Sequence, residues 1–250
     1  MYKIFKRILD ILIAGIALIL LSPILIPVMI ILWISGEHAV FYFQKRVGYK
    51  NKEFDIWKFA TMLKNSPNMG TGEITLRNDP RVLPFGKFLR ITKINELPQI
   101  FNVLNGDMSI VGPRPLMPVS FNLYSEAVKE KIYTSKPGMT GIGSIIFRDE
   151  ERIISQSTDP KKMYAEVVYP YKEKLEMWYL GKASMSTDIK IIFLTAWSIV
   201  FPKNQIQKCK QRNFSTSRSC NECAPCRRIY GPCNSTGYAG IANWWYNGTQ

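Results

Sequence analysis

An uncharged apolar run from Ile11 to Ile34 is the longest hydrophobic feature of the chain. As a helix its 24 residues would extend about 36 Å, which is enough to cross a bilayer. Ser22 and Pro23 lie near its middle, and a proline inside a helix removes a backbone hydrogen bond and bends the axis. Basic residues precede and follow the run, and cationic flanks favour the cytoplasmic face. The residues leave two structures open, a spanning helix and a re-entrant helix that breaks at Ser22–Pro23 and returns.

Shorter patterns predict a helix-rich α/β fold for the rest of the chain. Aromatic, β-prone residues on both sides of a turn at 48–52 predict a β-hairpin within Phe41–Leu63. Apolar and basic residues alternate at helical spacing over Phe85–Lys93, which fits a helix in the membrane interface or an amphipathic helix on a soluble core. Further helices are predicted over 121–135, 172–179 and 191–201, and a turn over 136–141.

A helix of about ten residues is predicted between Asn95 and Gly106. Asn95 is a favourable N-cap, Glu96 a favourable first-turn acid, and Gly106 a stop signal. Helix initiation alone would explain Asn95 and Glu96. The alternative is that both residues take part in catalysis.

Arg114 follows this helix and lies between two prolines, Pro113 and Pro115. Both prolines restrict the backbone around a planar cation, an arrangement that suits bidentate recognition of a phosphate. A rigid surface turn is the alternative interpretation.

The net charge of +14 indicates an anionic partner. No nucleic-acid-binding motif is visible, and the apolar run favours a membrane surface instead. All five cysteines follow residue 208, and the spacing of Cys220, Cys223, Cys226 and Cys233 is compatible with a metal site, a disordered basic tail or an appended segment. Asp149–Glu151 could ligate a metal or form a solvated acidic run.

Several segments resemble the signature of the bacterial sugar transferases, the monotopic phosphoglycosyl transferases. The central ones are Glu96–Gln99, Gly106–Ser109 and Val111–Pro115. Other similar segments are Gln44-x-Arg46-x-Gly48, Lys58–Met62, Lys136–Gly141, and Lys6-Arg7-x-x-Asp10 with Ser22–Pro23, which looks like the membrane hairpin of that family. The resemblance covers roughly the first four fifths of the chain. It favours the re-entrant helix.

The resemblance implies transfer of a sugar phosphate from a nucleotide-diphosphate sugar, usually uridine-linked, to polyprenyl phosphate, with release of the nucleoside monophosphate. The initiating step of exopolysaccharide or glycoconjugate assembly would then take place at the cytoplasmic face of a bacterial inner membrane. Mg²⁺ bound through Glu96 would compensate the charge of the donor, together with Arg114. The substrate-binding residues implied are Arg46, Lys58, Gln99, Pro113, Arg114, Pro115 and Asp188.

Two positions depart from the family pattern. Asn95 stands where the family has the nucleophilic aspartate, and Ala60 stands where it usually has arginine. Three hypotheses follow: direct transfer without a covalent intermediate, another nucleophile such as Glu96, Asp107 or Asp188, or a catalytically impaired binding or scaffolding protein.

Three parts are predicted along the chain: a membrane hairpin over 1–36, an interfacial catalytic domain over 37–202, and a basic cysteine-containing tail over 203–250. The sequence does not indicate an oligomeric state.

Overall fold

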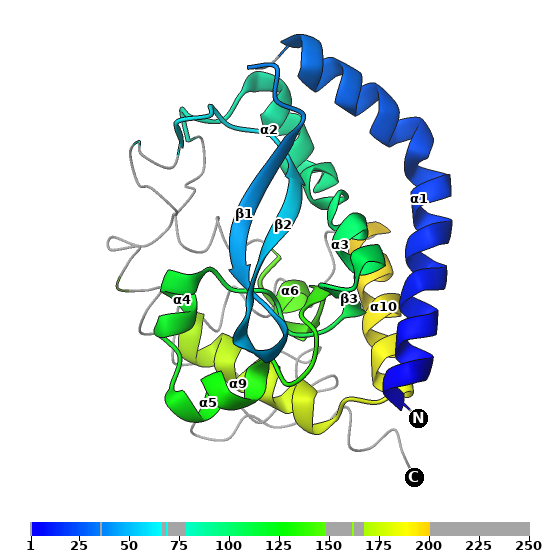
Figure 1. Cartoon of the computed structure of the whole chain (residues 1–250), viewed down its shortest axis with the longest axis vertical. Coiled ribbons are helices and arrows are strands. Elements are labelled where there is room, and N and C mark those ends of the chain that lie inside the picture. Colours follow the sequence, from blue (N-terminus) through cyan, green and yellow to red (C-terminus); the bar gives the residue numbers. More distant parts are fainter. Residues whose placement is uncertain are drawn as a thin grey trace, which may run out of the picture. The chain divides into compact units, whose positions relative to one another are not determined.

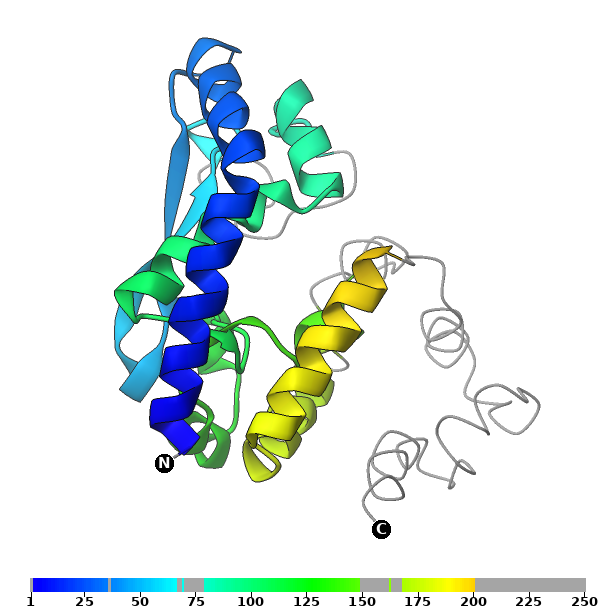
Figure 2. The same ribbon diagram turned by 90° about the vertical axis from the view of Figure 1, so that its right-hand side faces the viewer.

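The computed structural model describes residues 2–35, 37–66, 79–148 and 168–200, together with Met69 and Lys162. Residues 1–195 form one compact unit, and Figures 1 and 2 show the arrangement of its elements. The predicted tail and Asp149–Glu151 lie outside the described residues. The helices are α1 (Tyr2–Ser35), α2 (Pro84–Ile91), α3 (Gln99–Asn105), α4 (Pro118–Asn122), α5 (Glu126–Ile132), α6 (Ile142–Ile146), α9 (Tyr169–Gly181) and α10 (Met185–Val200).

The N-terminal helix α1 continues through Ser22–Pro23 without interruption, so the break predicted there is absent from the helix. Its axis bends in the part that approaches Ser35 (Figure 1). Pro23 cannot donate to the Ile19 carbonyl, and the Ser22 hydroxyl donates to that oxygen instead, at 2.8 Å. The carbonyl that the first proline leaves without its helical donor is therefore satisfied by the Ser22 hydroxyl.

One face of α1 packs against the rest of the unit along most of its length. Ala14 lies in a buried cluster with residues of β2 and α3, and Leu25, Val28 and Leu32 lie in a second cluster with Phe59 and Leu89. The other face exposes large apolar side chains, among them Ile4, Leu12, Ile16, Ile19, Leu20, Ile26, Ile30, Trp33 and Ile34. Among the described helices, α1 is the one long and apolar enough to cross a membrane.

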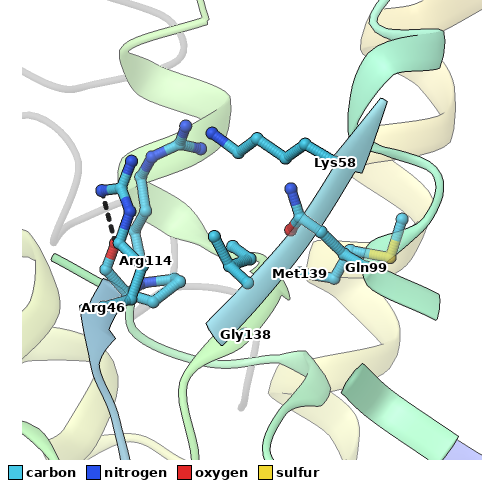
Figure 3. Close-up of a pocket in the computed structure, with 8 residues that line it drawn as sticks. Arg46, Lys58, Gln99, Arg114, Gly138 and Met139 are labelled. Carbon is cyan, nitrogen blue, oxygen red and sulfur yellow. Dashed lines mark hydrogen bonds between the residues drawn. The ribbon is translucent and has the colours of Figure 1, made fainter. Parts of the chain in front are cut away.

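The predicted β-hairpin is confirmed. Strands β1 (Phe41–Val47) and β2 (Glu53–Phe59) pair antiparallel from Phe41 opposite Phe59 to Val47 opposite Glu53. A 3₁₀ turn over Tyr49–Asn51 joins them. The hairpin brings Arg46 and Lys58, from opposite strands, to the same region of the molecule (Figure 3).

The helix predicted from Asn95 is divided into two pieces. Asn95 and Glu96 belong to a 3₁₀ turn, Ile94–Glu96, and α3 begins only at Gln99. Pro98 explains the division, since it has no N–H to donate to the Ile94 carbonyl, which instead accepts from the Leu97 N–H at 3.1 Å. The prediction of Asn95 as an N-cap is therefore wrong. The stop at Gly106 is confirmed by its left-handed φ of 93°.

The predicted turn at 136–141 contains a short strand. This strand, β4 (Gly138–Thr140), pairs parallel with β3 (Ser109–Val111). A side chain on Gly138 would collide with the main chain of Gly112, so the two segments approach closely only because both residues are glycines. The contact places residues 112–115 next to β4.

The helix predicted over 121–135 is two helices, α4 and α5. Ser125 adopts an extended conformation between them and precedes α5. The predicted helices over 172–179 and 191–201 correspond to α9 and α10, both of which begin earlier than the sequence indicated. α9 packs against α5 and α6. α9 also contacts the segment that carries Arg114, through Glu176.

Candidate functional site

A small, partly open pocket lies between the hairpin, α3, β4 and the segment around Arg114. Five predicted substrate-binding residues line it: Arg46, Lys58, Gln99, Arg114 and Pro115. The basic ends of Arg46, Lys58 and Arg114 converge at one side of the pocket (Figure 3). Such a cluster of cations suits a phosphate or diphosphate group.

Glu96 joins this cluster through Arg114. A carboxylate oxygen of Glu96 lies 3.6 Å from Nη2 of Arg114, and both side chains are partly exposed. Burial alone would raise the pKa of Glu96, but Arg114, Lys58, Lys93 and Arg46 outweigh it and lower the pKa to about 2. Glu96 is therefore ionised at any physiological pH.

The pKa of Lys58 lies close to neutral pH, so its charge changes with pH in this range. Burial and the neighbouring Arg46 lower its pKa to about 7, although the nearby Glu96 carboxylate acts in the opposite direction. Lys58 is consequently close to half protonated at neutral pH.

Asn95 is buried in the turn that presents Glu96, and its Oδ1 has no hydrogen-bond partner. An unpaired buried amide oxygen costs free energy, so its presence at Asn95 calls for an explanation. Among the described residues no three metal-type side chains form a cluster. Glu96 supplies the carboxylate of this turn, and carboxylate oxygen is a ligand that Mg²⁺ prefers.

The remaining predicted site residues lie at the edge of this arrangement or outside it. Pro113 does not line the pocket, but its carbonyl accepts the Gly138 N–H at 2.8 Å and fixes the segment to β4. Asp188 is almost completely buried and also does not line the pocket.

The carboxylate of Asp188 binds three donors. Lys6 and Tyr2 donate to one oxygen at 2.6 and 2.7 Å, and Tyr179 donates to the other at 2.8 Å. These contacts tie the N-terminal end of α1 to α9 and α10. That Asp188 binds substrate stays a prediction.

Three residues near Arg114 were not singled out by the sequence analysis. Tyr133 and Glu176 bind the Arg114 main chain, and Ser144 lies 3.4 Å from its Nη1. Glu176 lies at a buried position of α9, and an acid at the centre of a helix's buried face was the one signal that could have indicated it.

The comparison with known families agrees with this arrangement. The model of the family described as bacterial sugar transferase matches residues 1–202. The chain belongs to the bacterial sugar transferase family. Its position in this family accounts for the shared segments around Glu96, Arg114 and the hairpin.

Two of the three relatives described here are named as enzymes of undecaprenyl-phosphate chemistry, and the third is named as an exopolysaccharide production protein. An undecaprenyl-phosphate glucose phosphotransferase of Komagataeibacter xylinus is 33% identical over 204 residues, which are 80% of this chain and 36% of the relative. A UDP-glucose:undecaprenyl-phosphate glucose-1-phosphate transferase of Klebsiella pneumoniae is 35% identical, covering 78% of this chain and 40% of the relative. The exopolysaccharide production protein ExoY of Sinorhizobium fredii is 34% identical, covering 77% and 84%. The match thus spans about two fifths of the length of the first two relatives and most of ExoY.

Proposed function

We propose that this sugar transferase moves a sugar phosphate from a UDP-sugar to undecaprenyl phosphate and releases UMP, as the first step in building an exopolysaccharide or glycoconjugate. The observation that carries the proposal is the convergence of Arg46, Lys58 and Arg114 on one pocket beside the ionised Glu96. The names of the relatives supply the donor and acceptor classes.

The membrane attachment follows from the two faces of α1. Its exposed apolar face suits lipid, while Leu25, Val28 and Leu32 share a core with Phe59 and Leu89. A helix whose second half packs on the catalytic domain cannot place that half on the far side of the bilayer from the domain. We therefore propose that α1 lies in the cytoplasmic leaflet of the inner membrane as one bent, uninterrupted helix, with both of its ends on the cytoplasmic face.

Glu96 would hold a magnesium ion jointly with the phosphates of the donor. The ion held there would supply charge neutralisation for the donor diphosphate and its leaving group. Arg46, Lys58 and Arg114 bind and orient the anionic donor, and the positive charges of the two arginines and of protonated Lys58 stabilise the charge that moves to the leaving UMP.

Asn95 leads us to propose direct transfer. A phosphate oxygen of the lipid attacks the phosphorus that carries the sugar, the bond from that phosphorus to the UMP oxygen breaks, and UMP leaves with the electron pair. An amide is a poor nucleophile, and Asp188 is committed to Lys6, Tyr2 and Tyr179. In this route Asn95 serves as a neutral neighbour that does not repel the incoming lipid phosphate.

The test uses the full chain, purified in lipid nanodiscs, with UDP-glucose, UDP-galactose or UDP-N-acetylgalactosamine, Mg²⁺ and undecaprenyl phosphate. UMP should be released only when donor and acceptor are both present. No UMP with any donor would reject the enzyme and favour a binding or scaffolding protein, the alternative that Asn95 raises.

The Asn95→Asp variant tests the direct route. If the site is built for direct transfer, the added negative charge should not raise the rate, and no phosphosugar adduct should be detected by intact-protein mass spectrometry. A faster variant that accumulates such an adduct would show that the site retains the geometry for covalent catalysis.

A further inference from the structure

The main chain of Arg114 is held at both of its polar groups by buried side chains. Its carbonyl accepts from the Tyr133 hydroxyl at 2.9 Å, and the same hydroxyl oxygen accepts the Leu116 N–H at 2.8 Å. Its N–H donates to Oε1 of Glu176 at 3.4 Å. These two bonds use both polar groups of the Arg114 main chain. The flanking residues Pro113 and Pro115 have no N–H and cannot donate similar bonds.

Glu176 reaches this N–H from α9, 62 residues away in the sequence. Glu176 is only 3% exposed, and its second carboxylate oxygen, Oε2, has no hydrogen-bond partner. A buried carboxylate with one long hydrogen bond and one unpaired oxygen is a poor stabilising element, because its desolvation is not fully compensated. The hydrogen bond from the Arg114 N–H and the positive charge of the buried Lys172, one turn earlier on α9, are what offset this cost.

Gly143 leaves the space that Glu176 uses. A Cβ atom at residue 143 would lie 2.5 Å from Oε1 of Glu176, so any larger residue in α6 would displace the carboxylate from Arg114. Helix α6 packs on α9, and its Ser144 hydroxyl lies 3.4 Å from the Arg114 guanidinium. The main chain of Arg114 thus contacts α9, and its side chain contacts α6.

We infer that Glu176 is a positioning residue that fixes Arg114 through its main-chain N–H and so sets where the guanidinium stands relative to Glu96 and the donor phosphates. The inference rests on the proposed function for its kinetic consequence. A rigid arginine loses less freedom when it binds an anion, and a displacement of about 1 Å can reduce catalysis roughly a hundredfold.

The charges around Glu176 agree with this role. Arg114 and Lys172 are the cations that face Glu176. Its negative charge helps to raise the pKa values of Tyr124 and Tyr133. Burial raises its pKa to about 7, although the Arg114 N–H and the two cations act in the opposite direction. Either protonation state keeps a carboxyl oxygen that can accept from Arg114.

The closing experiment compares Glu176→Met, which removes the acceptor, with Glu176→Gln, which keeps an acceptor oxygen. Glu173→Gln, one turn earlier on α9, is the matched control. Glu176→Met should raise the KM for the UDP-sugar about tenfold and leave the KM for undecaprenyl phosphate within twofold, with Glu176→Gln and the control near wild type. A merely structural role would lower both kcat and the melting temperature and leave both KM values unchanged. That result would overturn the inference.

Gly143→Ala provides a second variant if Glu176→Met does not fold. It should raise the same KM, because it displaces the carboxylate from the side of α6. An unchanged donor KM in a folded Gly143→Ala protein with a displaced carboxylate would also contradict the inference.

Hydrogen exchange at the Arg114 amide separates this inference from the proposed function. Protection of that amide should fall at least about tenfold in Glu176→Met and not in Glu176→Gln, even in a protein that turns over no donor. Unchanged protection in Glu176→Met would reject the positioning role, whereas absent UMP release with altered protection would reject only the proposed reaction.

Discussion

Lys58 determines how donor binding should depend on pH. With a pKa near 7, it is largely charged at pH 6 and largely neutral at pH 8.5. An anionic donor binds better to the charged form, so binding above pH 7 requires uptake of a proton. The dissociation constant for UDP-glucose should therefore rise with pH, approaching about tenfold per pH unit, when measured by calorimetry between pH 6 and 8.5.

The Lys58→Met variant should show weak binding with little pH dependence over the same range. Lys52→Met changes an exposed lysine beyond the hairpin turn and should leave the wild-type profile intact. A wild-type dissociation constant that does not change with pH would mean that Lys58 is not in the binding site.

Glu176 should make the folded state less stable as pH rises. Its pKa is raised from 4.5 to about 7, so its contribution is fully favourable below pH 4.5 and is lost as pH rises through 7. Glu176→Gln has no such loss, and relative to wild type it should gain up to about 3 kcal/mol in unfolding free energy between pH 5 and pH 8. Denaturant unfolding at the two pH values measures this difference, and a variant that gains nothing would show that Glu176 does not titrate in this range.

The residues whose side chains line the pocket were predictable from the sequence, and those that contact the main chain of Arg114 were not. Arg46, Lys58 and Arg114 belong to recognisable segments, and the structure brings them to one pocket. Glu176 acts through a contact between segments 62 residues apart, and no local pattern specifies its partner. Asn95 was predicted as a cap because the sequence does not show that Pro98 divides the helix.

At the scale of elements, Asp10 joins α1 to β3. Its buried carboxylate accepts the Ile110 N–H at 2.9 Å, and Arg7, one turn earlier, donates to the Val103 and Leu104 carbonyls at the end of α3. α1 is therefore attached to the elements on both sides of residues 106–109.

Asp10→Ala should lower the unfolding free energy by about 1–3 kcal/mol, because the Ile110 N–H would lose its buried acceptor. Asp10→Asn keeps an acceptor oxygen and should lose less. Thermal unfolding in nanodiscs measures both variants. Equal losses in the two variants would show that charge, and not the hydrogen bond, is what Asp10 contributes.

The contact between Gly112 and Gly138 sets the distance between β3 and β4. Gly138→Ala should force the strands apart, with a loss of several kcal/mol in stability, roughly the cost of overpacking a rigid core. Gly181→Ala adds a methyl group where there is open space and should have little effect on melting temperature. A stable Gly138→Ala protein would mean that the strands can separate without cost.

The sequence predicted the hairpin and most helices but missed β4. Aromatic, β-prone residues on both sides of the turn at 48–52 indicate the hairpin, and each of its strands is seven residues long. β4 has only three residues, begins with glycine, and is specified by its partner β3 and not by its own composition. Short strands of this kind depend on tertiary contact.

At the scale of the whole unit, α1 has one face on protein and one face without protein cover. Composition alone could not reveal this division, since apolar residues occupy both faces. The topology is testable with single cysteines at Lys3 and Lys45, introduced after the five native cysteines are changed to serine. Both should react with an impermeant maleimide only in inside-out vesicles, and reaction from opposite sides would establish a spanning helix.

The uncovered face of α1 also has a kinetic consequence. A catalyst retained in one leaflet meets its lipid substrate by lateral diffusion, so the effective concentration of that substrate is its mole fraction in the surface. Adding inert phospholipid at constant bulk acceptor should slow turnover, a surface-dilution effect that is absent from enzymes that draw every substrate from water.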